Sequence, residues 1–256
     1  MVEHTRTHPR LTADVPPGLR EPLEAASLYV PEPLRRKPAL PLLVFFHGGA
    51  KVPELAAARN HMAAVTAQLG SGSGVYARAF ADPQRFPALV AEAEKKAGIR
   101  FTRVVLGGWS AGCGAVREII KSRESYDRVS AFVLIDGIHT GYASGKPGPL
   151  ESEIDTAPLE IWLQLARDAM AGRKRVLITH SEIFPGTFAS TTETTDYIVR
   201  QLGLRLRPVL KWGPMGTQQL SEVRSGRFLL IGYAGNSAPD HVDQLHSLPV
   251  YVRHLR

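Results

Sequence analysis

The chain has 256 residues, of which 44% are hydrophobic, and it carries a formal net charge of +7 and a single cysteine, Cys113. This length suits a large globular domain, and the sequence holds no apolar run long enough to cross a bilayer. One cysteine excludes an intrachain disulfide and a zinc site built on several thiolates. The basic residues are scattered rather than gathered in a stripe with interleaved aromatic residues, so we expect no nucleic-acid partner.

Residues 1–23 are predicted to form an N-terminal arm, because they are polar and rich in proline. They hold no apolar segment of the kind that a secretory signal peptide needs. We therefore expect either a cytoplasmic protein or a secreted protein from which the signal was removed.

From residue 24 onward, short apolar runs alternate with segments of helical composition. The run at 40–46 is apolar throughout, which is typical of a strand buried on both faces in a parallel sheet. In chain order we predict strands at 24–30, 40–46, 75–80, 104–106, 129–135, 175–179 and 227–233, and helices at 54–69, 82–97, 115–120, 159–171, 192–202 and the C-terminus. The sequence has no internal repeat and no low-complexity linker. Residues 24–256 are therefore predicted to form a single α/β domain, with a mostly parallel central sheet and helices on both faces.

The stretch Gly108-Trp109-Ser110-Ala111-Gly112 lies between a predicted strand and a predicted helix, and it matches the pattern G-x-S-x-G. A strained turn of this kind lifts the serine hydroxyl above the end of the sheet, and glycines let the neighbouring backbones pass closely. The helix that follows directs N–H groups toward the place where an anion would form. We predict that Ser110 is a catalytic nucleophile. The alternative is a serine in an ordinary turn between a strand and a helix.

Two further features complete a candidate site. The turn His47-Gly48-Gly49 follows the strand at 40–46, and we expect His47 to support this turn. His241 follows the last predicted strand through a short loop, and an imidazole can accept and return a proton near neutral pH. A histidine is therefore expected as the base, and His241 and His246 are the candidates. No spacing of the type H-E-x-x-H occurs, so we expect no metal site.

With these motifs in this chain order, the sequence resembles the α/β-hydrolase superfamily, and most closely its esterase and polyester-depolymerase-like members. The resemblance covers most of the chain from residue 24 as topology, with few specific motifs. It implies an α/β-hydrolase fold with a small lid or none, and no cofactor. It also implies that the backbone N–H groups of Ala111 and of Gly48 and Gly49 form an oxyanion hole. Because the family places its histidine in the loop after the last strand, the resemblance favours His241 as the base, with His246 as the alternative.

The carboxylate that orients the base has two candidates. Asp136 stands at the tip of the strand at 129–135, and Glu182 follows the strand at 175–179. The family most often places this acid after the later strand, and in some lipases after the earlier one. We favour Asp136, because aspartate is the commoner acid. Glu182 remains open, Asp196 and Asp243 are weaker candidates, and Asp240 is better explained as a helix cap.

The resemblance implies a serine hydrolase that cleaves a carboxylic ester through an acyl-enzyme on Ser110, using a Ser-His-Asp/Glu catalytic triad. The substrate would be a small-molecule or polymeric ester. An amidase, a thioesterase or a lactonase would use the same groups. A binding protein with a hydrolase-like fold and no activity is the alternative from another class. These patterns do not indicate an oligomeric state.

Overall fold

The computed structural model describes residues 7–146, 148 and 150–255. The chain forms two compact units. We call them the Ser110 unit, which comprises Leu11–Val133 and Leu248–Arg256, and the His241 unit, which comprises Met1–Arg10 and Leu134–Ser247. Of the predicted arm, residues 1–6 lie outside the described residues, and 18–23 form a strand. No helix in the described part of the chain has the length and apolar character that a membrane span requires.

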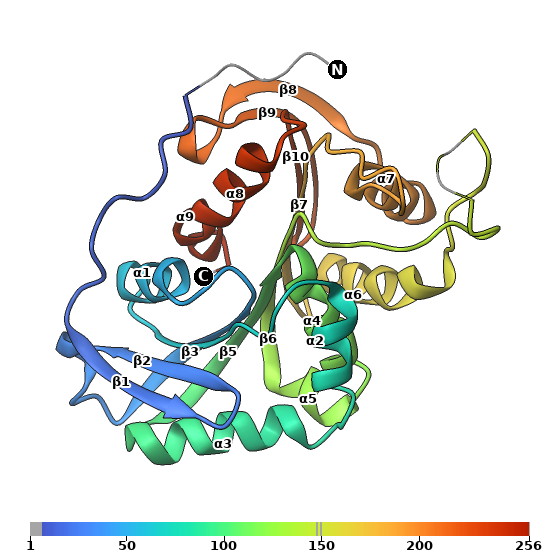
Figure 1. The fold of residues 1–256 in the computed structure, drawn as a ribbon. Coiled ribbons are helices and arrows are strands. Elements are labelled where there is room, and N and C mark those ends of the chain that lie inside the picture. The colour runs from blue at the N-terminus through green and yellow to red at the C-terminus, as the bar shows by residue number, and fades with distance from the viewer. Residues whose placement is uncertain (1–6, 147, 149, 256) are drawn as a thin grey trace. The chain divides into compact units, whose positions relative to one another are not determined.

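The Ser110 unit is built on a sheet whose central strands are parallel (Figure 1). Counted along the chain, the third strand pairs in parallel with both the fourth and the fifth. The first two strands, at one edge of the sheet, pair antiparallel with their neighbours. The stretch 42–46 is at most 1% exposed at every residue, as expected for a strand covered on both faces. The strand order is β1 (Gly18–Leu23), β2 (Ala26–Pro31), β4 (Ala63–Ala67), β3 (Ala39–Phe46), β5 (Arg100–Trp109) and the first part of β6 (Val129–Ile135).

Helices cover both faces of this sheet. Figure 1 shows α1 (Lys51–Arg59) and α9 (Leu248–Arg253) on one face, and α2 (Ser73–Ala79) and α4 (Cys113–Ile119) on the other. Within each pair the two helices pack against each other. The remaining elements are α3 (Arg85–Ala97), α5 (Arg123–Arg128) and the single turns η1 (Glu32–Leu34) and η2 (Ser110–Gly112).

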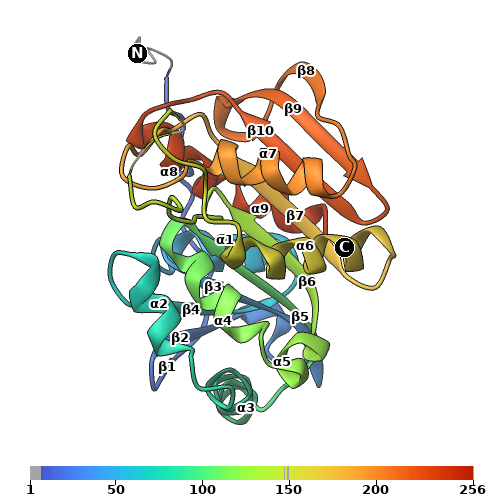
Figure 2. The ribbon, with the colours of Figure 1, turned by 90° about the vertical axis from the view of Figure 1, so that its right-hand side faces the viewer.

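The His241 unit continues from the end of β6 with four strands. Their order is β7 (Arg175–His180), β10 (Phe228–Tyr233), β9 (Gln218–Ser225) and β8 (Arg207–Trp212). β10 is parallel to β7 and antiparallel to β9, and β8 is antiparallel to β9. Figure 2 shows α6 (Glu160–Met170) and α7 (Thr191–Gln201) in front of these strands, and Figure 1 shows α8 (Ala238–His246) on their other face. Two single turns, η3 (Ala157–Leu159) and η4 (Pro214–Gly216), complete the unit. The mostly parallel sheet and its covering helices confirm the predicted fold class.

The helix predicted at 54–69 is wrong in its second half. The helix α1 ends at Arg59, the chain turns at His61 with a φ of 56°, and Ala63–Ala67 forms β4 between β2 and β3. Alanine favours helices in isolation, but the hydrogen bonds that this segment makes to two neighbouring strands override that preference.

The strand predicted at 75–80 is also wrong, because this segment belongs to helix α2, which packs on α4. The two helices approach closely, since a Cβ on Gly114 of α4 would collide with the carbonyl group of Ser73. The strands β8 and β9 were not predicted at all. β8 is exposed along almost its whole length, so it lacks the alternation of apolar and polar residues that marks a half-buried strand.

The glycine at position 112 gives a test of this packing. A Cβ there would collide with the carbonyl oxygen of Phe46, whereas a Cβ on Gly141 meets no atom within 4 Å. We predict that Gly112→Ala lowers the free energy of unfolding by about 2 kcal/mol through overpacking, and that the control Gly141→Ala leaves it unchanged. Urea denaturation of both variants measures this. Equal effects of the two substitutions would contradict the packing described.

Candidate active site

Ser110 lies at a strained corner between β5 and α4. β5 ends at Trp109 in an extended conformation, Ser110 has a φ of 50°, and the turn η2 leads directly into α4. A positive φ is unusual for a serine and requires support from the surrounding backbone. Glycines allow that support, because the backbones of Gly108 and Gly112 can approach each other closely only in the absence of a side chain. A Cβ on Gly108 would lie 2.6 Å from the backbone of Gly112. The predicted succession of strand, turn and helix is therefore present, with a half-buried serine at its apex.

The turn that follows β3 carries two backbone amides that converge. His47, Gly48 and Gly49 have φ values of 73°, 91° and 75°, so three consecutive residues are left-handed. The N–H groups of Gly48 and Gly49 both donate to Oε1 of Gln68, at 2.8 and 3.2 Å. These are the amides predicted to belong to an oxyanion hole, and here a side-chain oxygen occupies them. Sequence reasoning does not find Gln68, because the segment 54–69 predicts a helix and thereby hides the place of Gln68 directly after a strand.

His47 is held in place by aromatic neighbours. Its ring is stacked on Trp109, with ring centroids 4.9 Å apart, and its Nδ1 lies 2.9 Å from the hydroxyl of Tyr76. Tyr76 is fully buried, and burial raises the pKa of its phenol. Because Trp109 precedes Ser110 in the chain, this stacking ties the His47-Gly48-Gly49 turn to the corner that carries the serine.

In the His241 unit, Asp136 and His241 meet directly. Asp136 follows β6 with a φ of 43° and is only 2% exposed. Its Oδ2 lies 2.7 Å from Nδ1 of His241. The carboxylate also accepts hydrogen bonds from the backbone N–H and hydroxyl of Ser181, at 2.9 and 2.7 Å, and from the hydroxyl of Thr191, at 2.6 Å.

These partners keep the buried carboxyl ionised. Burial by itself would raise the pKa of Asp136, but the hydrogen bond and charge of His241, with the hydroxyls of Thr191 and Ser181, outweigh it and lower the pKa to about 2. Asp136 is therefore a carboxylate near neutral pH. A carboxylate in this position fixes the tautomer and orientation of the imidazole and stabilises its protonated form.

His241 lies in the first turn of helix α8 rather than in the predicted loop. The helix starts earlier than predicted because Ser237 and Asp240 form a capping box, in which each side chain accepts a hydrogen bond from the other residue's backbone N–H. Asp240 thus has the capping contact expected for it. The alternative base, His246, is the last residue of the same helix.

The alternative acids lie elsewhere. Glu182 is bound to the loop after β10, where its N–H donates to the carbonyl of Gly235 and its Oε2 accepts from the N–H of Gly235. Asp196 lies on α7, and Asp243 on α8. Asp136 and His241 are thus brought together within one unit, whereas Ser110, Ala111, Gly48 and Gly49 belong to the other unit.

Two further histidines, His139 and His180, are affected by the charge of Asp136, and both are neutral near neutral pH. Burial lowers the pKa of His139 to about 4, and the charge of Asp136 offsets only part of this effect. Burial also lowers the pKa of His180. His139 packs edge-on against Phe188, with ring centroids 5.1 Å apart. These two rings are therefore uncharged and add no positive charge of their own to the surroundings of Asp136.

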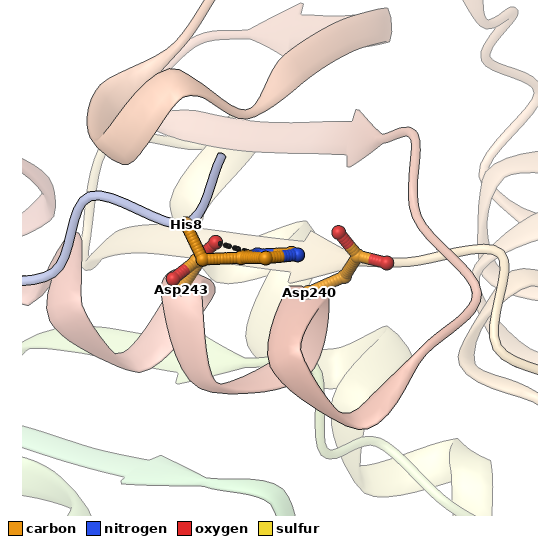
Figure 3. A group of neighbouring side chains, drawn as sticks. All are labelled: His8, Asp240 and Asp243. Carbon is orange, nitrogen blue, oxygen red and sulfur yellow. Dashed lines mark hydrogen bonds and ion pairs between the residues drawn. The ribbon is translucent and has the colours of Figure 1, made fainter. Parts of the chain in front are cut away.

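A second cluster, shown in Figure 3, joins the N-terminal arm to α8. Nδ1 of His8 lies 2.6 Å from the fully buried carboxylate of Asp243, and Nε of Arg10 lies 3.4 Å from its other oxygen. His8, Asp240 and Asp243 are the described residues whose candidate metal-ligand atoms gather within 4.8 Å of one another. Each of them already has a protein partner, and Arg10 adds a cation. The cluster is therefore explained as the ionic contact that docks the arm on the helix carrying His241.

Comparison with solved structures agrees with the fold. No protein-family model and no curated protein matches the chain. The structure is similar to a thermophilic esterase from Thermogutta terrifontis (17% identity over 93% of this chain and 92% of that one), an S-formylglutathione hydrolase from Agrobacterium tumefaciens (12%, 96% and 97%) and an acetyl xylan esterase from Aspergillus awamori (14%, 88% and 93%), each with a TM-score of 0.50. At such low identity the likeness establishes the fold alone: the chain has the α/β-hydrolase fold.

The lowered pKa of Asp136 predicts a pH-dependent stability. A carboxyl whose folded-state pKa lies below its unfolded-state value stabilises the fold above the unfolded value, and that contribution is lost as the pH falls through the folded pKa, here about 2. The advantage of the wild type over Asp136→Asn in free energy of unfolding should therefore shrink by about 2 kcal/mol between about pH 5 and about pH 2. Chemical denaturation across this range measures it. Parallel pH profiles of the two proteins would contradict the assignment.

The arm contact predicts a second effect on stability. Replacing both His8 and Arg10 with alanine removes two partners of a buried carboxylate, so the free energy of unfolding should fall by about 2 kcal/mol. Arg35→Ala is the control, because the ion pair between Arg35 and Glu32 is exposed. Thermal unfolding followed by circular dichroism compares the variants. If the double variant and the control have the same melting temperature, the arm contact does not stabilise α8.

Proposed function

We propose that this protein is a serine hydrolase that cleaves a carboxylic ester through an acyl-enzyme on Ser110. The observation that carries the proposal is the hydrogen bond between Asp136 and His241, because it supplies a base together with its orienting carboxylate. The strained conformation of Ser110 supports a nucleophile at that corner. The α/β-hydrolase fold, which the chain shares with the esterases from Thermogutta terrifontis and Aspergillus awamori, also supports the proposal.

In the first half of the proposed reaction, His241 acts through Nε2, because Nδ1 is bonded to Asp136. It takes the proton of the Ser110 hydroxyl while the serine oxygen attacks the acyl carbonyl carbon. The negative charge then moves to the carbonyl oxygen, which the N–H groups of Ala111 and of Gly48 and Gly49 stabilise. When the ester C–O bond breaks, His241 returns the proton to the leaving alkoxide, and the acyl group stays on Ser110.

In the second half, His241 takes a proton from water, and the hydroxide attacks the acyl carbonyl. The carboxylic acid leaves, and Ser110 recovers its proton. Every step is proton transfer and acyl transfer, so the proposed mechanism calls on no cofactor.

The proposed substrates are small-molecule or polymeric esters. The segment 136–156, between β6 and η3, holds an isolated bridge between Tyr142 and Ile154 and, in its described residues, no helix. A segment of this kind supports a small lid or none, which suits a fairly open site. An amide, a thioester or a lactone would be cleaved by the same steps, and a panel of such substrates separates these activities.

One observation favours the alternative of a binding protein without activity. The amides of Gly48 and Gly49 are occupied by Gln68, so a substrate oxygen has to compete for them. In such a protein Ser110 would be unreactive, and ester hydrolysis would not depend on it.

The hydrolysis of p-nitrophenyl acetate, an activated short-chain ester, tests the proposed function. Ser110→Ala should lower kcat/KM by a factor of about 10⁴ or more, because the attacking oxygen is removed. Its circular dichroism spectrum and melting temperature show whether the fold is kept. Activity that survives in Ser110→Ala would rule out the proposed acyl-enzyme.

Two carboxamide variants test which carboxylate serves the base. Asp136→Asn should lower kcat on the order of 10³–10⁴-fold, because an amide in that place no longer favours the productive tautomer of His241. Glu182→Gln is the matched control and should keep most of the activity, since Glu182 contacts the backbone of Gly235. The reverse pattern would assign the acid to Glu182.

A further inference from the structure

The turn after β3 holds a single oxygen atom on two backbone amides. The N–H groups of Gly48 and Gly49 point to Oε1 of Gln68, at 2.8 and 3.2 Å. This oxygen belongs to a carboxamide, so it is a carbonyl oxygen like the acyl oxygen of an ester. Two converging N–H donors are also what a developing oxyanion requires. Gln68 therefore occupies these donors as a substrate carbonyl would.

The contacts of Gln68 are those of a replaceable occupant. Gln68 directly follows β4, its side chain is exposed, and both of its hydrogen bonds to the glycine amides are at the surface. Its Nε2 lies 3.3 Å from Nδ1 of His47 and 3.3 Å from the carbonyl oxygen of Gly70. Water can satisfy the same groups when Gln68 leaves. A flexible side chain can therefore turn away without disturbing the core.

The structure also has space beside the turn. A pocket of about 280 Å³ is lined by Gln68 and Gly49 together with the small side chains of Ala25, Ser27, Ala50 and Thr66. The hydroxyls of Ser27 and Thr66 lie 2.9 Å apart and give its wall a polar patch. A carboxamide that leaves the amides can be accommodated here, because the pocket offers both room and hydrogen-bonding groups.

We propose that Gln68 is an internal occupant of the oxyanion hole, whose side chain an ester must displace before it reacts. This inference rests on the proposed hydrolase activity and adds a gate to it. The side-chain oxygen and the substrate carbonyl compete for the amides of Gly48 and Gly49. Apparent affinity is therefore reduced by the fraction of molecules in which Gln68 is in place. The same contact keeps the turn ordered while the site is empty.

The test compares Gln68→Ala with Gln68→Glu. Removing the side chain should lower KM for p-nitrophenyl acetate and raise the rate of labelling by a fluorophosphonate, each by about five-fold. A carboxylate in the same place should bind the two amides more strongly than the carboxamide does, so Gln68→Glu should raise KM and lower the labelling rate, each on the order of ten-fold. Gln201→Ala is the control, because Gln201 is an exposed glutamine at the end of α7 in the other unit.

The outcomes separate this inference from the proposed function. If the wild type neither reacts with the fluorophosphonate nor hydrolyses the ester in a Ser110-dependent way, the hydrolase proposal fails, and the gate fails with it. If the wild type reacts but Gln68→Ala is unchanged or slower, only the gate is overturned, and Gln68 is a support of the turn. Gln68→Asn has a side chain one carbon shorter and should behave as Gln68→Ala, which guards against a defect particular to one variant.

Discussion

The arrangement of the His241 unit depends on the buried carboxylate of Asp136. A buried charge is costly unless hydrogen-bond donors surround it, and four donors, from His241, Ser181 and Thr191, meet this one. They come from three places in the chain: the loop after β7, the start of α7 and the start of α8. The carboxylate therefore fixes the position of these elements while it orients the imidazole.

In the Ser110 unit, the candidate functional groups lie at the ends of strands. β3 ends at the His47-Gly48-Gly49 turn, β5 ends at Ser110, and Gln68 follows β4. In a parallel sheet these carboxyl ends lie at one edge, where backbone groups without strand partners are available for ligands. Here Gln68 satisfies two of them. An occupied pair of amides keeps a left-handed turn in order, at the cost of competition with any ligand that needs the same donors.

Much of the fold was predictable, because the buried strands are continuous apolar runs: β6 was predicted with its observed bounds at 129–135. The prediction failed where tertiary pairing overrides local preference, as in the alanine-rich β4, and where an exposed strand such as β8 has no apolar pattern. Of the candidate site, Ser110, Asp136 and His241 could be proposed from the ends of predicted strands. The occupation of Gly48 and Gly49 by Gln68 could not, because a side-chain contact across 20 residues leaves no pattern in a single sequence.

In the proposed reaction Ser110 is a nucleophile that His241 activates. Mass spectrometry of the protein after reaction with a fluorophosphonate tests it most directly, because the adduct identifies the reacting side chain. We expect an adduct on Ser110 in the wild type and little or none in His241→Ala under the same conditions. An adduct on another residue, no adduct, or equal labelling of Ser110 in His241→Ala would contradict it.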